Sequence, residues 1–215
     1  GAWVTSQVTT MSAMFHSAYA FDNGGQPLAW DTSKVTDMSA MFLEAYAFNQ
    51  PLTFDTSQVT DMSLMFIYAR AFNRPLAFTN TSQVTDMSLM FREAWAFNQP
   101  LTFDTAQVTT MREMFYEATA FNSDVSNWNT GAVTDMQGIF FNSGFTRTLC
   151  GGAWKSLIET ANAFSSVGTS TARLVSCCDD VDGSGTDFAS CVGGTNHLKD
   201  VLTNTCATDT CIASD

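Results

Sequence analysis

Hydrophobic and polar positions along this chain follow one pattern that recurs with a long, regular period. The stretch VTDMSLMF occurs at 59–66 and again at 84–91, and four related stretches begin at other valines. The six valines that open these copies are Val8, Val35, Val59, Val84, Val108 and Val133. A period of about 25 residues, held over six copies, is typical of a solenoid and falls within the range of leucine-rich repeats.

The half of each repeat that follows the valine has its apolar residues on what would be one face of a helix. In the second copy they lie at positions i, i+3, i+4 and i+7, which are Met38, Met41, Phe42 and Ala45. That spacing is typical of an amphipathic α-helix. Thr36 comes just before it, where a threonine side chain can accept a hydrogen bond from a free amide of the first turn. The pattern predicts one short helix per repeat.

The other half of the repeat alternates between apolar and polar residues, as a strand does. In LTFDTSQV (52–59), Leu52 and Phe54 would point inward, and Thr53 and Asp55 would point outward. We therefore expect an α/β fold. It would be a leucine-rich-repeat-like solenoid over residues 1–149, with one short strand and one short helix in each repeat of about 24–25 residues.

The 11 methionines of the chain all lie inside these repeats. A unit of this length cannot bury its own apolar stripe, so it stacks on the next unit. We expect two methionine columns along the stack, formed by Met11, Met38, Met62, Met87, Met111 and Met136, and by Met14, Met41, Met65, Met90 and Met114 with Ile139. Unbranched methionine adapts to small differences in packing. We therefore interpret the columns as core, not as a metal or cofactor site.

The last third of the chain differs from the repeats because it holds all six cysteines, which are Cys150, Cys177, Cys178, Cys191, Cys206 and Cys211. An even number of cysteines in a loop-rich segment indicates disulfide bonds made in an oxidising compartment. The segment has no CxxC pair, which argues against structural zinc. We predict a disulfide-rich capping module over 150–215, with a helix near 152–164 lying across the last repeat.

The first repeat has no equivalent cap in the sequence. AWVTSQV (2–8) aligns with AWDTSKV (29–35), so the sequence starts inside a repeat. An uncovered end of a stack exposes an apolar edge. Three explanations remain open: upstream repeats that were cut away, an end that meets another subunit head to tail, or an edge that blunts itself.

The charge balance narrows the choice of partner. Nine Lys+Arg residues against 21 Asp+Glu give a net charge of −12. Phosphate backbones and anionic membranes would be repelled, so we expect no nucleic acid partner. No apolar run of about 18 residues occurs, which predicts no membrane span. A protein partner fits better, and a second copy of the chain in a head-to-tail oligomer is one form of it.

Outward positions of the strand halves form a candidate binding face. Its residues are Asp31, Thr53, Asp55, Thr102 and Asp104, with Thr79 and Asn129 interposed in the aspartate row. Carboxylates about 5 Å apart along such a row could bind cations or a basic partner, or could simply be solvated. A second column contains only threonines, which are Thr9, Thr36, Thr60, Thr85, Thr109 and Thr134. A regular array of this kind suggests ice or glycan contact, but helix capping explains it more simply.

Two short motifs suggest modification or metal binding. The triplet NTS at 80–82 is an N-glycosylation acceptor sequence at Asn80, within a turn that carries one extra residue. DVDGSGTD (180–187) is similar to the start of a calcium loop, with oxygen ligands from Asp180, Asp182 and Ser184. Cys191 replaces the bidentate glutamate expected at the end of that loop, so an ordinary Asp/Gly-rich turn is the favoured alternative. We expect no cofactor apart from this candidate calcium ion.

Catalytic residues cannot be placed in this sequence. It has only two histidines, His16 and His197, and His16 falls at a repeat position that varies freely. It has no nucleophile elbow, no phosphate loop and no recognisable pair of acid–base carboxylates. We expect that the chain is not an enzyme.

The repeat resembles that of the BspA-like cell-surface family. The stretch AFNQPLTFDTSQVTDMSLMF is similar to the family's unit, which reads approximately F-N-x-x-L-S-x-W-D-T-S-x-V-T-x-M-x-x-M-F, and the resemblance covers residues 3 to about 145. It implies a leucine-rich-repeat-type solenoid and an extracellular or cell-surface location. It also implies adhesion or unassigned binding, and the family has no shared catalytic residues to carry over to this chain.

From these observations we expect a secreted structural or adhesive protein that acts through protein–protein contacts, with self-assembly end to end into a filament or surface layer as one form. An alternative is an extracellular module that binds glycan, mineral or ice through its threonine and aspartate columns. A further alternative is an accessory subunit of a larger extracellular or lumenal assembly.

Overall fold

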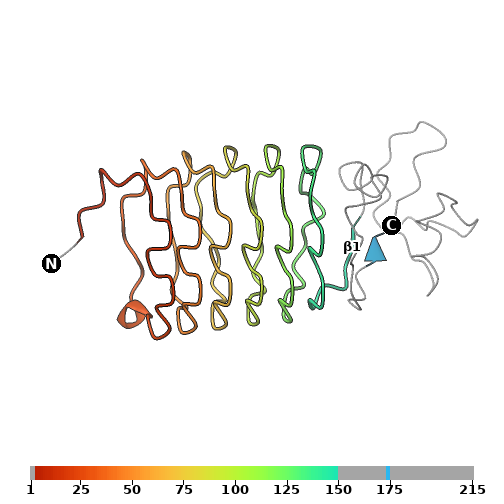
Figure 1. The fold of residues 1–215 in the computed structure, drawn as a ribbon, viewed down its shortest axis with the longest axis horizontal. Helices are drawn as coiled ribbons and strands as arrows, with labels where there is room; N and C mark the ends of the chain where they lie inside the picture. The colour runs from red at the N-terminus through yellow and green to blue at the C-terminus, as the bar shows by residue number, and fades with distance from the viewer. Residues whose placement is uncertain (1–2, 150–172, 175–215) are drawn as a thin grey trace, which may run out of the picture.

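The computed structural model describes residues 3–149 and 173–174. The chain winds in coils of one repeat each, and Figure 1 shows the coils side by side from the N-terminal end (red) to the sixth (green). We number them from the repeat valines as coil 1 (8–34), coil 2 (35–58), coil 3 (59–83), coil 4 (84–107), coil 5 (108–132) and coil 6 (133–149). The three-residue 3-10 helix η1 (Asn23–Gly25) accounts for the extra length of coil 1.

Parallel pairing joins each coil to the next at single residues. One series of bridges links Thr10, Asp37, Asp61, Asp86, Thr110 and Asp135, and a second links Leu28, Leu52 and Leu76. Beyond the sixth repeat valine, strands β1 (Thr148–Leu149) and β2 (Arg173–Leu174) pair in parallel. The register of the bridges places equivalent repeat positions directly over one another, so the period in the sequence becomes a set of columns in space.

The helix expected in each repeat is not formed in the described residues, and a chain of tight turns takes its place. In coil 2 the amide of Met41 donates to the carbonyl of Met38 at 3.3 Å, and the amide of Leu43 donates to Ala40 at 3.1 Å. The residues Ala40 and Glu44 have φ of 54° and 59°, which no α-helix contains. The amides between these turns donate to the next coil, as Phe42 does to Met65 at 2.9 Å.

This difference has a simple physical cause. Apolar residues spaced by three and four positions face one way in a helix, but they also do so in a series of turns closed by bonds from residue i+3 to residue i. Each turn leaves an amide and a carbonyl that a helix would have paired internally, and the neighbouring coil pairs them instead. Thr36 therefore caps no helix. We keep the leucine-rich-repeat-like solenoid only as a proposal, with turns in place of helices.

The methionines lie in the core, as the repeat predicts. All six members of the column from Met11 to Met136 are at most 2% exposed, and Met41, Met65, Met90 and Met114 are fully buried. Met14, in coil 1, is half-buried. Leu52 and Phe54 are buried while Thr53 is exposed, so the inward and outward positions agree with the prediction. The strand expected in each repeat is not formed in coils 1 to 5 and is reduced to single-residue bridges such as Leu28 to Leu52.

Three columns of aromatic rings run beside the methionines and complete the core. Within a column the ring centroids are about one coil spacing apart, for example 5.5 Å between Phe42 and Phe66 and 5.9 Å between Phe48 and Phe72. The rings are nearly parallel, with interplanar angles of 4° and 10° in these two pairs. Trp30 and Phe54 begin the third column at 6.4 Å. These stacked rings contribute a large share of the buried apolar surface.

Two polar ladders cross the same stack. Buried threonines donate their hydroxyl to a carbonyl of the next coil, as Thr32 does to Asp55 at 2.9 Å and Thr105 does to Asn129 at 2.8 Å. The side-chain oxygen of Asn49 accepts the amide of Asn73, and Asn73 accepts that of Asn98, both at 3.0 Å. The threonine ladder satisfies hydroxyls that would otherwise be costly to bury, and the half-buried to exposed asparagine ladder links consecutive coils at the surface.

Several predicted features lie outside the described residues. They are the capping module over 150–215, the helix near 152–164, the cysteines, and the candidate calcium ligands Asp180, Asp182 and Ser184. Within residues 3–149 and 173–174, no helix has the length and apolar character needed to cross a membrane.

Candidate functional site

The predicted binding face lies on the outside of the strand halves, and its carboxylates are already engaged. Asp31 accepts hydrogen bonds at Oδ1 from the hydroxyl of Ser33 at 2.7 Å and from its amide at 3.1 Å. Asp55 accepts from the amide of Ser57 at 3.0 Å. These bonds close tight turns, so each aspartate carboxylate already stabilises the loop that contains it.

The remaining members of the face show where the sequence alignment needs correction. Asp104 closes the same kind of turn by accepting the amide of Ala106 at 3.0 Å. In coil 3 it is Asn80, not Thr79, that takes this position, because the amide of Ser82 donates to Asn80 Oδ1 at 2.8 Å. Thr79 instead donates its hydroxyl to Asp55 at 3.0 Å. Thr53 and Thr102 are exposed beside this row, and binding by the face stays a prediction.

The hydrogen bonds within these turns lower the pKa values of the aspartate carboxylates. The pKa of Asp31 lies below its ordinary value of 3.8, mainly because of the hydrogen bond from the Ser33 side chain. The amide of Ser57 lowers the pKa of Asp55 in the same way, and the amide of Ser126 lowers the pKa of Asp124. Hydrogen bonds donated to a carboxylate favour its charged form.

These lowered pKa values predict an acid-sensitive stack. As the pH falls through about 4, the unfolded chain takes up protons on these aspartates before the folded chain does. The stabilisation that they give is therefore complete above that pH and is lost as the pH falls through the lowered folded-state pKa values. We expect the urea midpoint to decline on acidification, and Asp55→Asn, which keeps an oxygen acceptor, to flatten the decline. Identical pH profiles for the two proteins would contradict this account.

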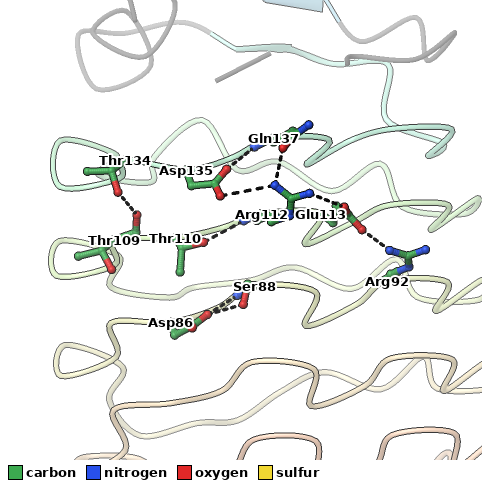
Figure 2. Close-up of polar contacts among 10 residues, drawn as sticks. All are labelled: Asp86, Ser88, Arg92, Thr109, Thr110, Arg112, Glu113, Thr134, Asp135 and Gln137. Carbon is green, nitrogen blue, oxygen red and sulfur yellow. Dashed lines mark hydrogen bonds and ion pairs between the residues drawn. The ribbon is translucent and has the colours of Figure 1, made fainter. Parts of the chain in front are cut away.

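The threonine column lies at the exposed corner after each repeat valine. From Thr36 on, each hydroxyl donates to the backbone carbonyl of the threonine one coil earlier, as Thr60 does to Thr36 at 3.2 Å. Figure 2 shows the bond from Thr134 to Thr109, at 3.1 Å. All six threonines are exposed. Inter-coil bonding, rather than helix capping, is thus their structural role, and their outer surface is open to solvent.

Asn80, the predicted glycosylation acceptor, is exposed in the turn of coil 3. Its side-chain oxygen is used within the turn, and the next residue, Thr81, is buried and donates its hydroxyl to Asp104 at 3.1 Å. Modification at this asparagine stays a prediction.

A charged network ties coils 4, 5 and 6 together on another edge of the stack. Glu113 lies between Arg92 and Arg112, and Arg112 also contacts Gln137 and approaches Asp135 at 3.8 Å (Figure 2). In the earlier coils the position of Glu113 is held by Ala13, Ala40, Leu64 and Leu89. Glu113 therefore places a charge in coil 5 at a position where coils 1 to 4 have an apolar side chain.

Aromatic and cationic side chains line a further edge, one from each of coils 1 to 4. Tyr19 stacks on Tyr46 with centroids 5.0 Å apart, and the guanidinium of Arg70 lies 4.8 Å from the ring of Tyr46 and 4.2 Å from that of Trp95. Tyr19 and Trp95 are 54% and 42% exposed. The sequence pattern gives little sign of this edge because its members differ in type, although all occupy the variable position of the A-x-A-F stretch.

Among the described residues, coil 1 holds the first members of the core columns. Phe15, Phe21 and Trp30 are the first full members of the three aromatic columns and are half-buried, whereas their counterparts in coil 2 are fully buried. Trp3 lies 6.0 Å from Trp30, centroid to centroid, and remains 67% exposed. These residues line a shallow depression together with the loop that contains Asn23 and Pro27.

Along residues 10–17 of coil 1, the backbone hydrogen bonds to the neighbouring coil all run in one direction. Its amides at residues 11, 13, 15 and 17 donate to coil 2, at distances of 2.8–2.9 Å. Among the described residues nothing donates to the carbonyls of Thr10, Ser12, Met14 and His16, although their counterparts in coil 2 all accept such bonds. The face therefore offers a row of acceptors beside half-buried rings. We call this combination the coil 1 face.

The structure thus brings some predicted residues together and leaves others apart. Asp31 and Asp55 share one face with Thr53, while Thr102 and Asp104 lie two coils further along it. Within the described residues, no group of three His, Cys, Asp or Glu side chains could hold a metal ion. His16 is exposed in coil 1 and, in the part of the chain that the structure describes, takes part in no ion pair.

Comparison with known proteins gives one match. The family model described as "Mycoplasma protein of unknown function, DUF285" matches residues 1–102 and 74–173. The two matches overlap within the repeats, as expected when one repetitive model fits a stack in two registers, and together they span well over half of the chain. No curated protein and no solved structure matches it.

Proposed function

The chain belongs to the family described as "Mycoplasma protein of unknown function, DUF285", and from this starting point we propose that it is an extracellular structural or adhesive repeat protein. Like the BspA-like surface proteins that its repeat resembles, it acts through protein–protein contacts and carries out no catalytic step. We further propose that it assembles end to end into a filament or surface layer.

The coil 1 face is the observation that carries this proposal. Each inner coil is covered by a neighbour that supplies amide donors to its carbonyls and stacks a ring on each of its rings. The coil 1 face presents the same carbonyl row without such donors among the described residues. It also presents the same three rings, of which Trp30 has the largely exposed ring of Trp3 at 6.0 Å. A coil of the same repeat, supplied by a second copy, is the surface most complementary to it.

The directed backbone bonds restrict how two copies can meet. Two coil 1 faces brought together would oppose acceptor rows to each other, which leaves carbonyls without donors. A head-to-tail contact supplies donors to acceptors and can repeat without closing, so it generates a filament. This geometry supports end-to-end assembly over a symmetric dimer.

We expect charge placed on the coil 1 face to block assembly. Trp3→Glu combined with Val4→Lys should lower the fraction of oligomer several-fold, because both side chains are exposed at this end, 67% and 87%, and their replacement does not open the core. Size-exclusion chromatography with light scattering over a range of concentrations gives the measurement.

Trp95→Glu is the matched control, since it charges an exposed tryptophan on the side of the stack. It should leave the oligomer fraction unchanged. A parent protein that stays monomeric at every accessible concentration would overturn the proposal of self-assembly.

The second candidate function is a ligand-binding module for glycan, mineral or ice. The observation in its favour is the unbroken exposed threonine column, in which five hydroxyls, from Thr36 to Thr134, donate in the same direction. Replacing Thr60, Thr85 and Thr109 by alanine, and separately replacing Thr53, Asp55, Thr102 and Asp104, would locate the binding column. Unchanged binding in both variants would reject this candidate and leave the protein as a structural or accessory subunit of a larger assembly.

A further inference from the structure

The aromatic edge carries a feature that the end-to-end contact does not use. Its members follow one another from coil to coil as Tyr19, Tyr46, Arg70, Trp95 and Thr119. The register is fixed by backbone bonds of 3.2 Å from Ala47 to Tyr19, from Ala71 to Tyr46 and from Ala120 to Trp95. These five side chains therefore form one column on the outside of the stack, in the order of the coils.

In this column a cation is held between two aromatic rings. The guanidinium of Arg70 lies 4.8 Å from the centroid of Tyr46 and 4.2 Å from that of Trp95, both within the range of a cation–π contact. The same chemistry occurs once more on the neighbouring edge, where Arg92 lies 4.4 Å from the ring of Tyr116. The chain itself thus shows that this surface accommodates guanidinium groups between coils.

The run of aromatic and cationic side chains in this column ends at Trp95. Arg70 of coil 3 covers one side of the indole, and the counterpart in coil 5 is Thr119, which has neither a ring nor a cation. Thr119 donates its hydroxyl to the carbonyl of Trp95 at 3.4 Å, so it stays close to the backbone. Trp95 is consequently 42% exposed, whereas Phe91 and Phe97 of the same coil have rings on both sides and are fully buried.

Two carboxylates occupy nearby positions of the repeat. Glu93 and Glu117 occupy equivalent positions in coils 4 and 5, each two residues before a member of the column, and both are half-buried. Glu93 lies 3.9 Å from Arg92 and also interacts with Tyr68. Within the described residues Glu117 takes part in no ion pair. An aromatic face beside an uncompensated carboxylate is the arrangement that attracts an arginine.

We propose that the open side of Trp95 is the docking site for an arginine side chain from a basic segment of a partner protein, with Glu117, two residues before Thr119, as the carboxylate that pairs with it. The guanidinium stacks on the indole in the place that Thr119 leaves open, as Arg70 does on the other side, and donates hydrogen bonds to Glu117. The net charge of −12 draws such a segment to the surface, and the indole and the carboxylate fix where it lies.

Binding of an arginine-rich peptide to the full chain, measured by isothermal titration calorimetry at physiological salt, tests this proposal. Trp95→Ala should weaken the peptide about three- to fivefold, the size of an exposed cation–π contact, and Glu117→Gln should weaken it to a similar degree. Asp124→Asn removes one charge elsewhere while keeping its turn acceptor, and should leave the affinity unchanged. A peptide with citrulline in place of arginine should bind no better to the parent than to Trp95→Ala.

A substitution that places an arginine of the chain itself beside Trp95 gives an independent check. Thr119→Arg should place a guanidinium on Trp95 and reduce peptide binding more than Asn127→Arg, which adds the same charge at an exposed position of the same coil. Equal effects of the two arginine variants, or equal effects of Trp95→Ala and Asp124→Asn, would show general attraction of a polycation to an acidic protein and overturn the proposed site. Either result leaves the oligomer measurement untouched, because Trp95 lies away from the coil 1 face.

Discussion

Phe66→Ala should cost the stack about 3–5 kcal/mol of unfolding free energy. The ring of Phe66 is fully buried and lies 5.5 Å from Phe42, 5.4 Å from Phe91 and 4.3 Å from Phe72, centroid to centroid. Its removal leaves a cavity bounded by rings in three consecutive coils. Those rings cannot collapse into the cavity without breaking the backbone bonds that set the coil spacing, such as Phe66 to Met90 at 2.8 Å.

The same substitution at the end of the same column is the matched control. Phe15 stacks on Phe42 at 5.4 Å and on Phe21 at 3.9 Å, but it is only half-buried and no further coil lies over it among the described residues. Phe15→Ala should therefore cost less than half as much. Urea unfolding followed by circular dichroism measures both variants. Equal losses at the two positions would contradict a continuous core, because stability in a stack depends on the interfaces between neighbouring coils.

The period of the sequence was enough to predict the stacking axis and the buried residues. A period repeated this faithfully permits one register, and the bridges from Thr10 to Asp135 follow it. The methionine columns followed from the same register. The phenylalanine columns could have been predicted in the same way, because the F of A-x-A-F recurs as regularly as the methionines.

Local backbone structure could not be predicted from the same pattern. Met38, Met41, Phe42 and Ala45 satisfy the spacing of a helix, and no residue among them forbids one. What decides against a helix is the neighbouring coil, whose carbonyls take the amides that the helix would have used. That competition depends on contacts between residues a full repeat apart, which a search for periods of three and four residues does not detect.

The columns of exposed side chains show a related limit of prediction from the sequence. Asp31 and Asp104 are exposed as the alternation predicts and Asp55 is half-buried, but the alternation does not predict their turn bonds to the residues two positions on. The D-x-[SA] spacing that produces these bonds was present in the sequence. The aromatic edge left no such signal, since Tyr, Arg and Trp become equivalent only once the register is known.

Ala40 offers the sharpest test of turns against helices, because the two structures predict opposite results. Its φ is 54°, in the left-handed region, and its amide donates to Ser63 at 2.8 Å. Ala40→Gly should leave the unfolding free energy unchanged or raise it by up to about 1 kcal/mol, since glycine adopts this φ without the strain of a Cβ atom. In a helix the same change would destabilise by about 1 kcal/mol.

Ala40→Pro should be among the most damaging single changes in the chain, at about 3 kcal/mol or more. The proline ring holds φ in the negative region, which is incompatible with the left-handed turn, and it removes the amide that bonds coil 2 to coil 3. The proline variant alone would also break a helix, so the pair of variants carries the argument. Thermal or urea unfolding of both variants gives the measurement. If Ala40→Gly lost about as much unfolding free energy as a glycine substitution in a helix interior, the turn geometry of the repeat would be wrong. The inter-coil bonding on which the coil 1 face depends would then be wrong as well.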